Sequence, residues 1–305
     1  MDVLSQAQAN DLSPEGRLHA AKTAYNKERR ILFLRNFYRN KLALIGSIVI
    51  SIVGLFALIA PILTPYHPLD VDVVNRLQAP SAEHWFGTDN FGRDIFSRAA
   101  YGARISLLVG VAVALITGTL GMIIGLCASY FKRLDYVLMR ICDGLMAFPA
   151  ILLAIAIMAA MGPKVQNVIF ALSVVYTPNV ARAVRSVALI AKEQTYVEAM
   201  HSIGASHFRV LFKHIAPNCW TPVIIQGTFI FADAIISEAA LSFLGAGIPA
   251  PTASWGNILY DGKMYIYNGW WMVLFPGILL MMTVLGLNLS GDGLRDLLDP
   301  HGKNK

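Results

Sequence analysis

The sequence alternates long apolar runs with shorter polar segments. Because lipid leaves no water to pair with backbone polar groups, each run that crosses a membrane is predicted to be an α-helix. The strand-length alternation of an outer-membrane barrel is absent. Six runs approach or exceed the roughly 20 helical residues that cross a hydrocarbon core of about 30 Å: Leu42–Leu63, Ile105–Tyr130, Val137–Met161, Val165–Ala188, Trp220–Leu244 and Trp271–Leu289. The pattern therefore predicts an all-α polytopic membrane protein with about six transmembrane helices.

The polar segment Thr195–Asn218, between the fourth and fifth apolar runs, has an internal pattern of its own. Thr195, with Glu198 three residues later, forms the pattern of a capping box and predicts the start of a short helix. Gly204 is predicted to end that helix in the left-handed conformation. Ser206 is then predicted to cap a second short helix.

The second short helix is predicted to be amphipathic. Pro217 is predicted to end it. Four apolar residues recur at the i, i+3, i+4 and i+7 spacing that lines one helix face: Phe208, Leu211, Phe212 and Ile215. Two short helices that share an apolar face form a knob suited to a groove in a partner protein. The same pattern is also typical of a helix that lies in the lipid headgroups.

Composition agrees with a membrane protein. The chain is 56% hydrophobic and 14% charged, against roughly 45–50% and 25% in soluble domains. Its three cysteines, Cys127, Cys142 and Cys219, show no CxxC spacing, so neither a disulfide nor a metal site is predicted.

The placement of Lys and Arg predicts the orientation. With the N-terminus inside, 19 basic residues fall on the cytoplasmic side and 6 outside, a strong positive-inside bias. Both termini and the Thr195–Asn218 loop are therefore predicted to be cytoplasmic, and the net charge of +6 requires no nucleic acid. Residues 1–41 read as a cytoplasmic tail without a cleavable signal, whose Arg29–Lys41 part is predicted to lie on the inner leaflet.

Three acidic residues lie within the predicted spans: Asp143, Asp233 and Glu238. A buried charge in a bilayer is costly unless it is paired or wetted, so each is expected to face a helix interface or a water-filled path. Asp143 is expected to pair with Arg140 near the cytoplasmic edge. For Asp233, a pathway role and a structural role are equally supported.

The Thr195–Asn218 loop resembles the EAA loop of permease subunits of binding-protein-dependent ABC importers. The resemblance rests on Glu198-Ala199-Met200, on Gly204 and on Pro217 thirteen residues later. The chain departs from the usual pattern at three positions, Met200, His214 and Ala216. In that family the loop inserts into the ATPase subunit, which implies a coupling role for Glu198, Ala199, Gly204, Phe208, Leu211, Phe212 and Pro217.

Further blocks resemble the C-type permease subunit of the peptide/nickel class: residues 84–107, 242–259 and 288–300. Glycine turns and Asp–Arg pairs are expected to hold the first of these blocks together outside the membrane. The resemblance implies the type I ABC importer permease fold in a bacterial inner membrane. It divides the chain into an N-terminal tail (1–41), a first span with its external loop (42–104), a core (105–290) and a C-terminal tail (291–305).

The resemblance also implies partners and cargo. A second homologous permease subunit would complete a heterodimer, two ATPase subunits would dock inside, and a periplasmic or extracellular substrate-binding protein would dock outside. Dipeptides or oligopeptides are the expected cargo, with glutathione, an opine or a nickel chelate as alternatives. No cofactor is implied.

Two other classes of function fit less well. An ion-driven secondary transporter usually shows internal repeats and broken helices with binding groups at the midplane, and no convincing repeat is found between the first three spans and the last three. A membrane enzyme would need clustered acids, bases or metal ligands. The sequence contains no GxxxxGK[ST], HExxH or GxSxG motif, so the chain is not expected to hydrolyse ATP itself or to be an enzyme.

Overall fold

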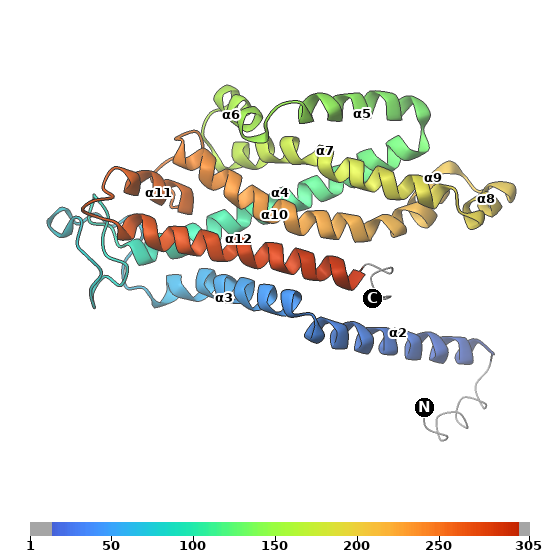
Figure 1. Cartoon of the computed structure of the whole chain (residues 1–305), viewed down its shortest axis with the longest axis horizontal. Coiled ribbons are helices and arrows are strands. Elements are labelled where there is room, and N and C mark those ends of the chain that lie inside the picture. Colours follow the sequence, from blue (N-terminus) through green and yellow to red (C-terminus); the bar gives the residue numbers. More distant parts are fainter. Residues whose placement is uncertain (1–13, 299–305) are drawn as a thin grey trace, which may run out of the picture.

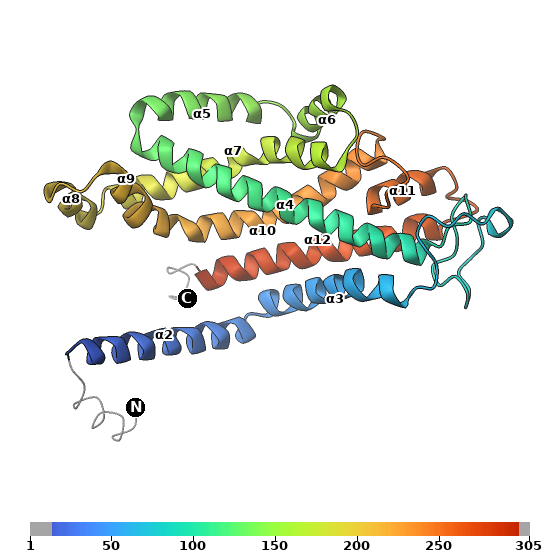
Figure 2. The ribbon, with the colours of Figure 1, turned by 180° about the vertical axis from the view of Figure 1, so that it is seen from behind.

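The computed structural model describes residues 14–298, and this part of the chain is almost entirely helical. Long helices run roughly along one axis (Figure 1). The short helices α8 and α9 project at one end, while α11 and the loop before α4 lie at the other (Figures 1 and 2). By the charge distribution, the α8–α9 end is cytoplasmic and the α11 end is external.

The helices follow the predicted runs with several changes of boundary. They are α2 (Pro14–Arg39), α3 (Lys41–Leu63), α4 (Ile95–Tyr130), α5 (Lys132–Met146), α6 (Ala150–Met161), α7 (Val165–Lys192), α8 (Thr195–Ser202), α9 (His207–Arg209), α10 (Trp220–Phe243), α11 (Trp255–Lys263) and α12 (Trp271–Leu298), with short η1 (Val73–Asn75), η2 (Val210–Ile215) and η3 (Ala216–Cys219) turns. Residues 1–13 and 299–305, which belong to the two predicted tails, lie outside the described residues.

The centre of the fold is the contact between α4 and α7. A Cβ at Gly121 would lie 2.5 Å from the Cβ of Val180, and one at Gly125 would lie 2.7 Å from the Cβ of Val184. Small residues at this spacing let helix backbones approach closely in membranes, where there is little hydrophobic force between helices. The two helices, together with α6 and α10, enclose the largest buried apolar cluster.

The first span is packed onto the last. α3 lies beside α12 (Figure 1), where a Cβ at Gly46 would lie 2.5 Å from the backbone nitrogen of Ser290 and one at Gly293 would lie 2.5 Å from the Cα of Ala43. The other face of α3 is apolar and exposed, as Ile48, Ile52 and Leu55 show. That face is suited to lipid contact.

The third predicted span, Val137–Met161, is broken. α5 and α6 are separated at residues 147–149 and bent by 94°. By length and composition, residues 14–298 contain five helices that could cross a membrane, or six if the bent pair counts as one span. The break comes at Phe148-Pro149, because the residue before a proline avoids the α conformation and the proline has no amide hydrogen.

Two other boundaries differ most from those expected. α4 begins at Ile95 rather than Ile105, with Asp94 as its N-cap, so it carries the end of the predicted external loop. α12 continues to Leu298, beyond the expected span end at Leu289.

A network of charges joins the external loop to α11. Arg93 Nε donates to Asp89 Oδ2 at 2.6 Å and its Nη2 to Asp261 Oδ2 at 3.2 Å. The buried Arg98 lies between the same two carboxylates, with its Nη2 3.4 Å from Asp261 Oδ2. Trp271 Nε1 donates to the carbonyl of Thr88. We call residues 84–98 with α11 the external cap. Its Asp–Arg pairs confirm the expectation that such pairs hold this segment together.

Burial affects the charges of the external cap. It raises the pKa of the Asp261 carboxyl, while Arg98 and Arg93 act in the opposite direction. The two guanidinium groups around this carboxyl therefore favour its charged form against the effect of burial.

Candidate functional site

The cytoplasmic loop begins with α8, but not with the expected cap. The carbonyl of Gln194 accepts hydrogen bonds from the amides of Val197 and Glu198, which makes Gln194 the N-cap residue. Thr195 is the first residue of the helix rather than the one before it. The predicted capping box between Thr195 and Glu198 is therefore wrong, although a helix does start at this point.

The turn between the two short helices follows the prediction. Gly204 has a φ of +77°, in the left-handed region that glycine adopts at least cost. The hydroxyl oxygen of Ser206 accepts from the amide of Arg209 at 3.4 Å, so Ser206 caps α9.

The second short helix does not end at Pro217. Residues from His207 to Phe243 form one helical segment of 37 residues. Within it, Val210–Ile215 is wound as a π-helix and Ala216–Cys219 as a 3₁₀ turn. Pro217 lies near the start of that 3₁₀ turn, where its missing amide hydrogen costs little. The loop is thus directly continuous with α10.

The predicted apolar stripe divides into two parts. Leu211 is 3% exposed and Ile215 is fully buried, so both belong to the core of the chain. Phe208 is 72% exposed and Phe212 is 42% exposed, with their ring centroids 4.4 Å apart. Leu211 therefore cannot share an outward face with the two phenylalanines, because it points into the protein.

We call the three exposed apolar residues of this loop, Ile203 and the paired Phe208 and Phe212, the cytoplasmic knob. The other residues that the sequence pattern singled out are also exposed beside it: Glu198, Ala199, Gly204 and Pro217.

Hydrogen bonds hold the knob against the membrane helices. Tyr130 Oη at the end of α4 lies 2.6 Å from Nδ1 of His207. Asn218 Nδ2 donates to the carbonyl of His214 at 2.9 Å and to Tyr196 Oη at 3.1 Å. Together with the buried Val197 and Val210, these contacts fix the loop as a firm projection rather than a loose tether.

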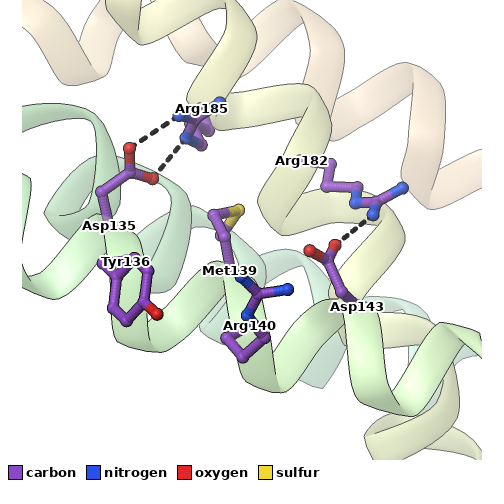
Figure 3. Close-up of a pocket in the computed structure, with 7 residues that line it drawn as sticks. All are labelled: Asp135, Tyr136, Met139, Arg140, Asp143, Arg182 and Arg185. Carbon is purple, nitrogen blue, oxygen red and sulfur yellow. Dashed lines mark hydrogen bonds and ion pairs between the residues drawn. The ribbon is translucent and has the colours of Figure 1, made fainter.

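A second candidate site is a charged pocket between α5 and α7, of about 470 Å³ (Figure 3). Arg185 Nε and Nη2 donate to Asp135 Oδ1 and Oδ2 at 2.6 and 2.7 Å. Arg182 pairs with Asp143, and both side chains are about half exposed. Figure 3 shows the two pairs side by side across the same two helices.

The expected pairing of Asp143 with Arg140 is wrong. Arg140 instead lies over the ring of Tyr136, with its Cζ 5.7 Å from the ring centroid. Arg182 takes its place from α7. Sequence reasoning missed Asp135, Arg182 and Arg185 as a site, although the two arginines one turn apart in the predicted fourth span were a signal.

The two other membrane acids have different surroundings. Glu238 is fully buried between α4 and α10, where Ser106 Oγ and Ser242 Oγ donate to its carboxylate at 3.0 and 2.8 Å. Asp233 is exposed one turn before Ser237, whose hydroxyl lies 2.7 Å from Tyr176 Oη. Glu238 therefore sits at a helix contact, and Asp233 on an open face.

Within residues 14–298, no group of three or more His, Cys, Asp or Glu side chains is placed to hold a metal ion. All three cysteines are free.

Comparison with known families decides the class of this protein. The family described as "Binding-protein-dependent transport system inner membrane component" matches residues 117–303. The chain belongs to this family. A second match, the "N-terminal TM domain of oligopeptide transport permease C", covers residues 31–80 of the permease.

Several curated proteins are similar to this permease over most of their length. A putative peptide transport system permease protein of Brucella abortus is 49% identical over 90% of this chain and 92% of its own. The dipeptide transport system permease protein DppC of Alkalihalophilus pseudofirmus is 48% identical over 87% and 88%. A chain of the MetNI methionine ABC transporter in an inward-facing conformation superimposes with a TM-score of 0.49 at 20% identity, over 63% of this chain and 94% of that one.

Membership of the family confirms the expected class. The chain is a multi-pass inner-membrane permease of an ABC importer. It is a transport component and not an enzyme. A permease of this kind works with ATPase subunits and a substrate-binding protein.

Proposed function

We propose that this permease pairs with a second, related permease subunit and that the two form a pathway for dipeptides or oligopeptides. In this proposal two ATPase subunits dock inside, one of them on the Thr195–Asn218 loop, and a substrate-binding protein docks outside. The observation that carries the coupling role is the cytoplasmic knob. The names of the similar permeases, which refer to peptides and dipeptides, support the cargo.

The knob has the properties of a docking surface. Phe208 and Ile203 are each more than 70% exposed to water in the single chain, and clustered exposed apolar side chains mark interaction sites. A helix lying in the headgroups would run along the membrane surface. Here α9 continues into α10 along the long axis of the molecule (Figure 1), which favours docking into a partner.

The residues proposed to couple the ATPase are those of the loop that remain exposed. They are Glu198, Ala199, Gly204, Phe208, Phe212 and Pro217. Leu211 supports them from the core.

A test of coupling replaces Phe208 or Phe212 with Asp. A charge on the docking face must be desolvated on binding, so transport and substrate-stimulated ATP hydrolysis of the reconstituted importer should both fall. Phe208→Leu, which keeps an apolar side chain, is the matched control and should retain both activities. An assembled Phe212→Asp complex with normal transport and normal stimulation would remove the coupling role.

The charged residues on α5, α7 and α10 are proposed to point towards the second permease subunit and a water-filled pathway. Asp143, Arg182 and Asp233 are exposed in the single chain, and charged side chains within a membrane turn towards protein or water. The outer face of α3, by contrast, is apolar. Glu238 is not part of this exposed face and is proposed to secure the α4–α10 contact.

Cysteine labelling in the assembled importer tests this orientation. A cysteine at position 233 should react with a membrane-impermeant thiol reagent. Ile224→Cys, on another face of α10, should react only with a lipid-soluble reagent. Labelling of Asp233→Cys from the lipid phase alone would contradict the proposed pathway face.

The cargo is tested separately from the coupling. Uptake of a labelled dipeptide into vesicles holding the full importer should require ATP and the cognate substrate-binding protein, and unlabelled dipeptide should compete with it. If only glutathione, an opine or a nickel chelate competed, the peptide assignment would be wrong, while the permease class would stand.

A further inference from the structure

An apolar groove of about 610 Å³ runs between α4 and the continuous helix that joins α9 to α10. None of its lining residues is ionisable. Representative members are Leu115, Gly118 and Ile123 on α4, and Phe212, Trp220 and Gly227 on the facing helix.

The groove opens away from the charged face. On α10 its lining residues extend to Phe231. Asp233 comes two residues later, which turns it about 200° around the helix axis. The side chains of Leu115, Ile123 and Ile224 along the groove are exposed in the single chain. This side of the molecule therefore offers a hydrophobic surface where the opposite side offers charges.

Glycine gives the groove its depth. A Cβ at Gly227 would meet no atom within 4 Å, and one at Gly118 would meet only Val223, at 3.5 Å. Among the described residues, only Val223 thus approaches the space above these two glycines. A groove lined by apolar atoms is not a site for ordered water, which needs polar partners.

The groove is longer than one membrane leaflet is thick. Its wall on α4 extends from Val111 to Leu126, a span of about 22 Å at the rise of an α-helix. Half of the hydrocarbon core is about 15 Å thick. The groove is therefore long enough to hold an acyl chain that spans a single leaflet.

Basic residues flank the cytoplasmic end of the groove. The exposed Trp220 lines that end, together with Phe212, a residue that the groove shares with the cytoplasmic knob. Lys213 follows Phe212 directly and Arg209 precedes it by one turn, and both are exposed. On the α4 side, the exposed pair Lys132 and Arg133 comes just after the helix ends. Tryptophan favours the membrane–water interface, and clustered Lys and Arg at the cytoplasmic side favour anionic headgroups.

We propose that this groove is a binding site for an anionic phospholipid of the inner leaflet. One acyl chain lies between α4 and α10, and the phosphate lies near Arg209 and Lys213. The apolar lining accounts for the chain, and the flanking charges account for the headgroup. The proposal rests on the membrane location of the permease and not on its cargo.

Bromine quenching of tryptophan fluorescence tests the site in the assembled importer. The complex is placed in bilayers that contain a small fraction of phosphatidylglycerol or phosphatidylcholine with the same brominated acyl chains. The emission of Trp220 is obtained as the difference between the native complex and a Trp220→Phe complex. Brominated phosphatidylglycerol should quench this emission at a lower fraction than brominated phosphatidylcholine.

Two sets of variants distinguish recognition of the lipid headgroup from binding of the acyl chain. Each of Arg209→Gln and Lys213→Gln should lower the preference for the anionic lipid by about fivefold. Gly227→Leu should fill the groove and reduce quenching by both lipids. Gly54→Leu is the matched control, because Gly54 also lies on a membrane helix with no atom within 4 Å of a Cβ but is not part of the groove. It should leave quenching unchanged.

Two results would overturn the proposal. Equal quenching by both lipids that persists in Gly227→Leu would show ordinary bulk lipid beside Trp220. Absence of quenching by either lipid in the assembled importer would show that a helix of a partner subunit fills the groove.

Discussion

The external cap and the cytoplasmic knob, at the two ends of one bundle, differ in which kind of side chain they bury and which they expose. In the cap, charged side chains are buried and paired: Arg98 is 1% exposed and lies between Asp89 and Asp261. In the knob, apolar side chains are exposed, as Phe208 shows. A buried ionic network is intolerant of the loss of one partner, whereas an exposed apolar tip contributes little to the stability of its own chain. The cap therefore holds the fold, and the knob is available for binding.

The largest effect is expected from Arg98→Ala in the external cap. The change leaves the carboxylates of Asp89 and Asp261 with one guanidinium instead of two, and breaking a buried pair costs about 3–5 kcal/mol. Thermal unfolding of the detergent-solubilised permease should show this loss, and Arg98→Lys, which keeps the charge, should lose less. If Arg98→Ala unfolded at the same temperature as the unmodified permease, the network would not stabilise the cap.

An intermediate effect is expected from a matched pair of glycines. Gly92 in the cap and Gly204 beside the knob have φ values of +78° and +77°. A Cβ at Gly92 would overlap the carbonyl of Asp72, whereas one at Gly204 would meet no described atom within 4 Å. Both Ala variants lose about 1–2 kcal/mol to left-handed strain, and Gly92→Ala should lose more because two segments must also separate. Equal losses in thermal unfolding would contradict this difference between the two ends.

The smallest effect on stability is expected from Phe208→Ala in the knob. Its side chain is mostly in water, so the free energy of unfolding should change by no more than about 0.5 kcal/mol. Leu211→Ala, three residues away but buried, should lose about 2–5 kcal/mol. Co-purification should nevertheless show weaker retention of the ATPase by Phe208→Ala. If both variants unfolded at the same temperature, the division of the apolar stripe into core and knob would be wrong.

Hydrophobic runs predicted most of the helices, because a helix that crosses a membrane can be recognised from its own residues alone. The break at Phe148-Pro149 could have been predicted from the proline, since such a pair disfavours a continuous helix. The pairing of Asp143 with Arg182 could not, because the two residues lie on different helices and the sequence offered Arg140 as a nearer partner.

The cytoplasmic knob shows the same limit of prediction from local sequence. Periodicity placed Phe208, Leu211, Phe212 and Ile215 on one face, as a regular α-helix would. The π-helical winding of Val210–Ile215 and the packing of Leu211 against the core changed which of them are exposed. Local signals located the Gly204 turn and the Ser206 cap correctly, since both depend only on residues close by in the sequence.

The π-helical stretch Val210–Ile215 fixes the rotational phase between the knob and the rest of α10. A π turn closes its hydrogen bond over one more residue than an α turn. If all six residues of this stretch were rewound as ordinary α turns, the surplus residue would add about 100° of rotation. Asp233 and the groove would then swing together by that angle relative to Phe208. One surplus residue thus sets the direction in which a docked ATPase would push the transmembrane helix.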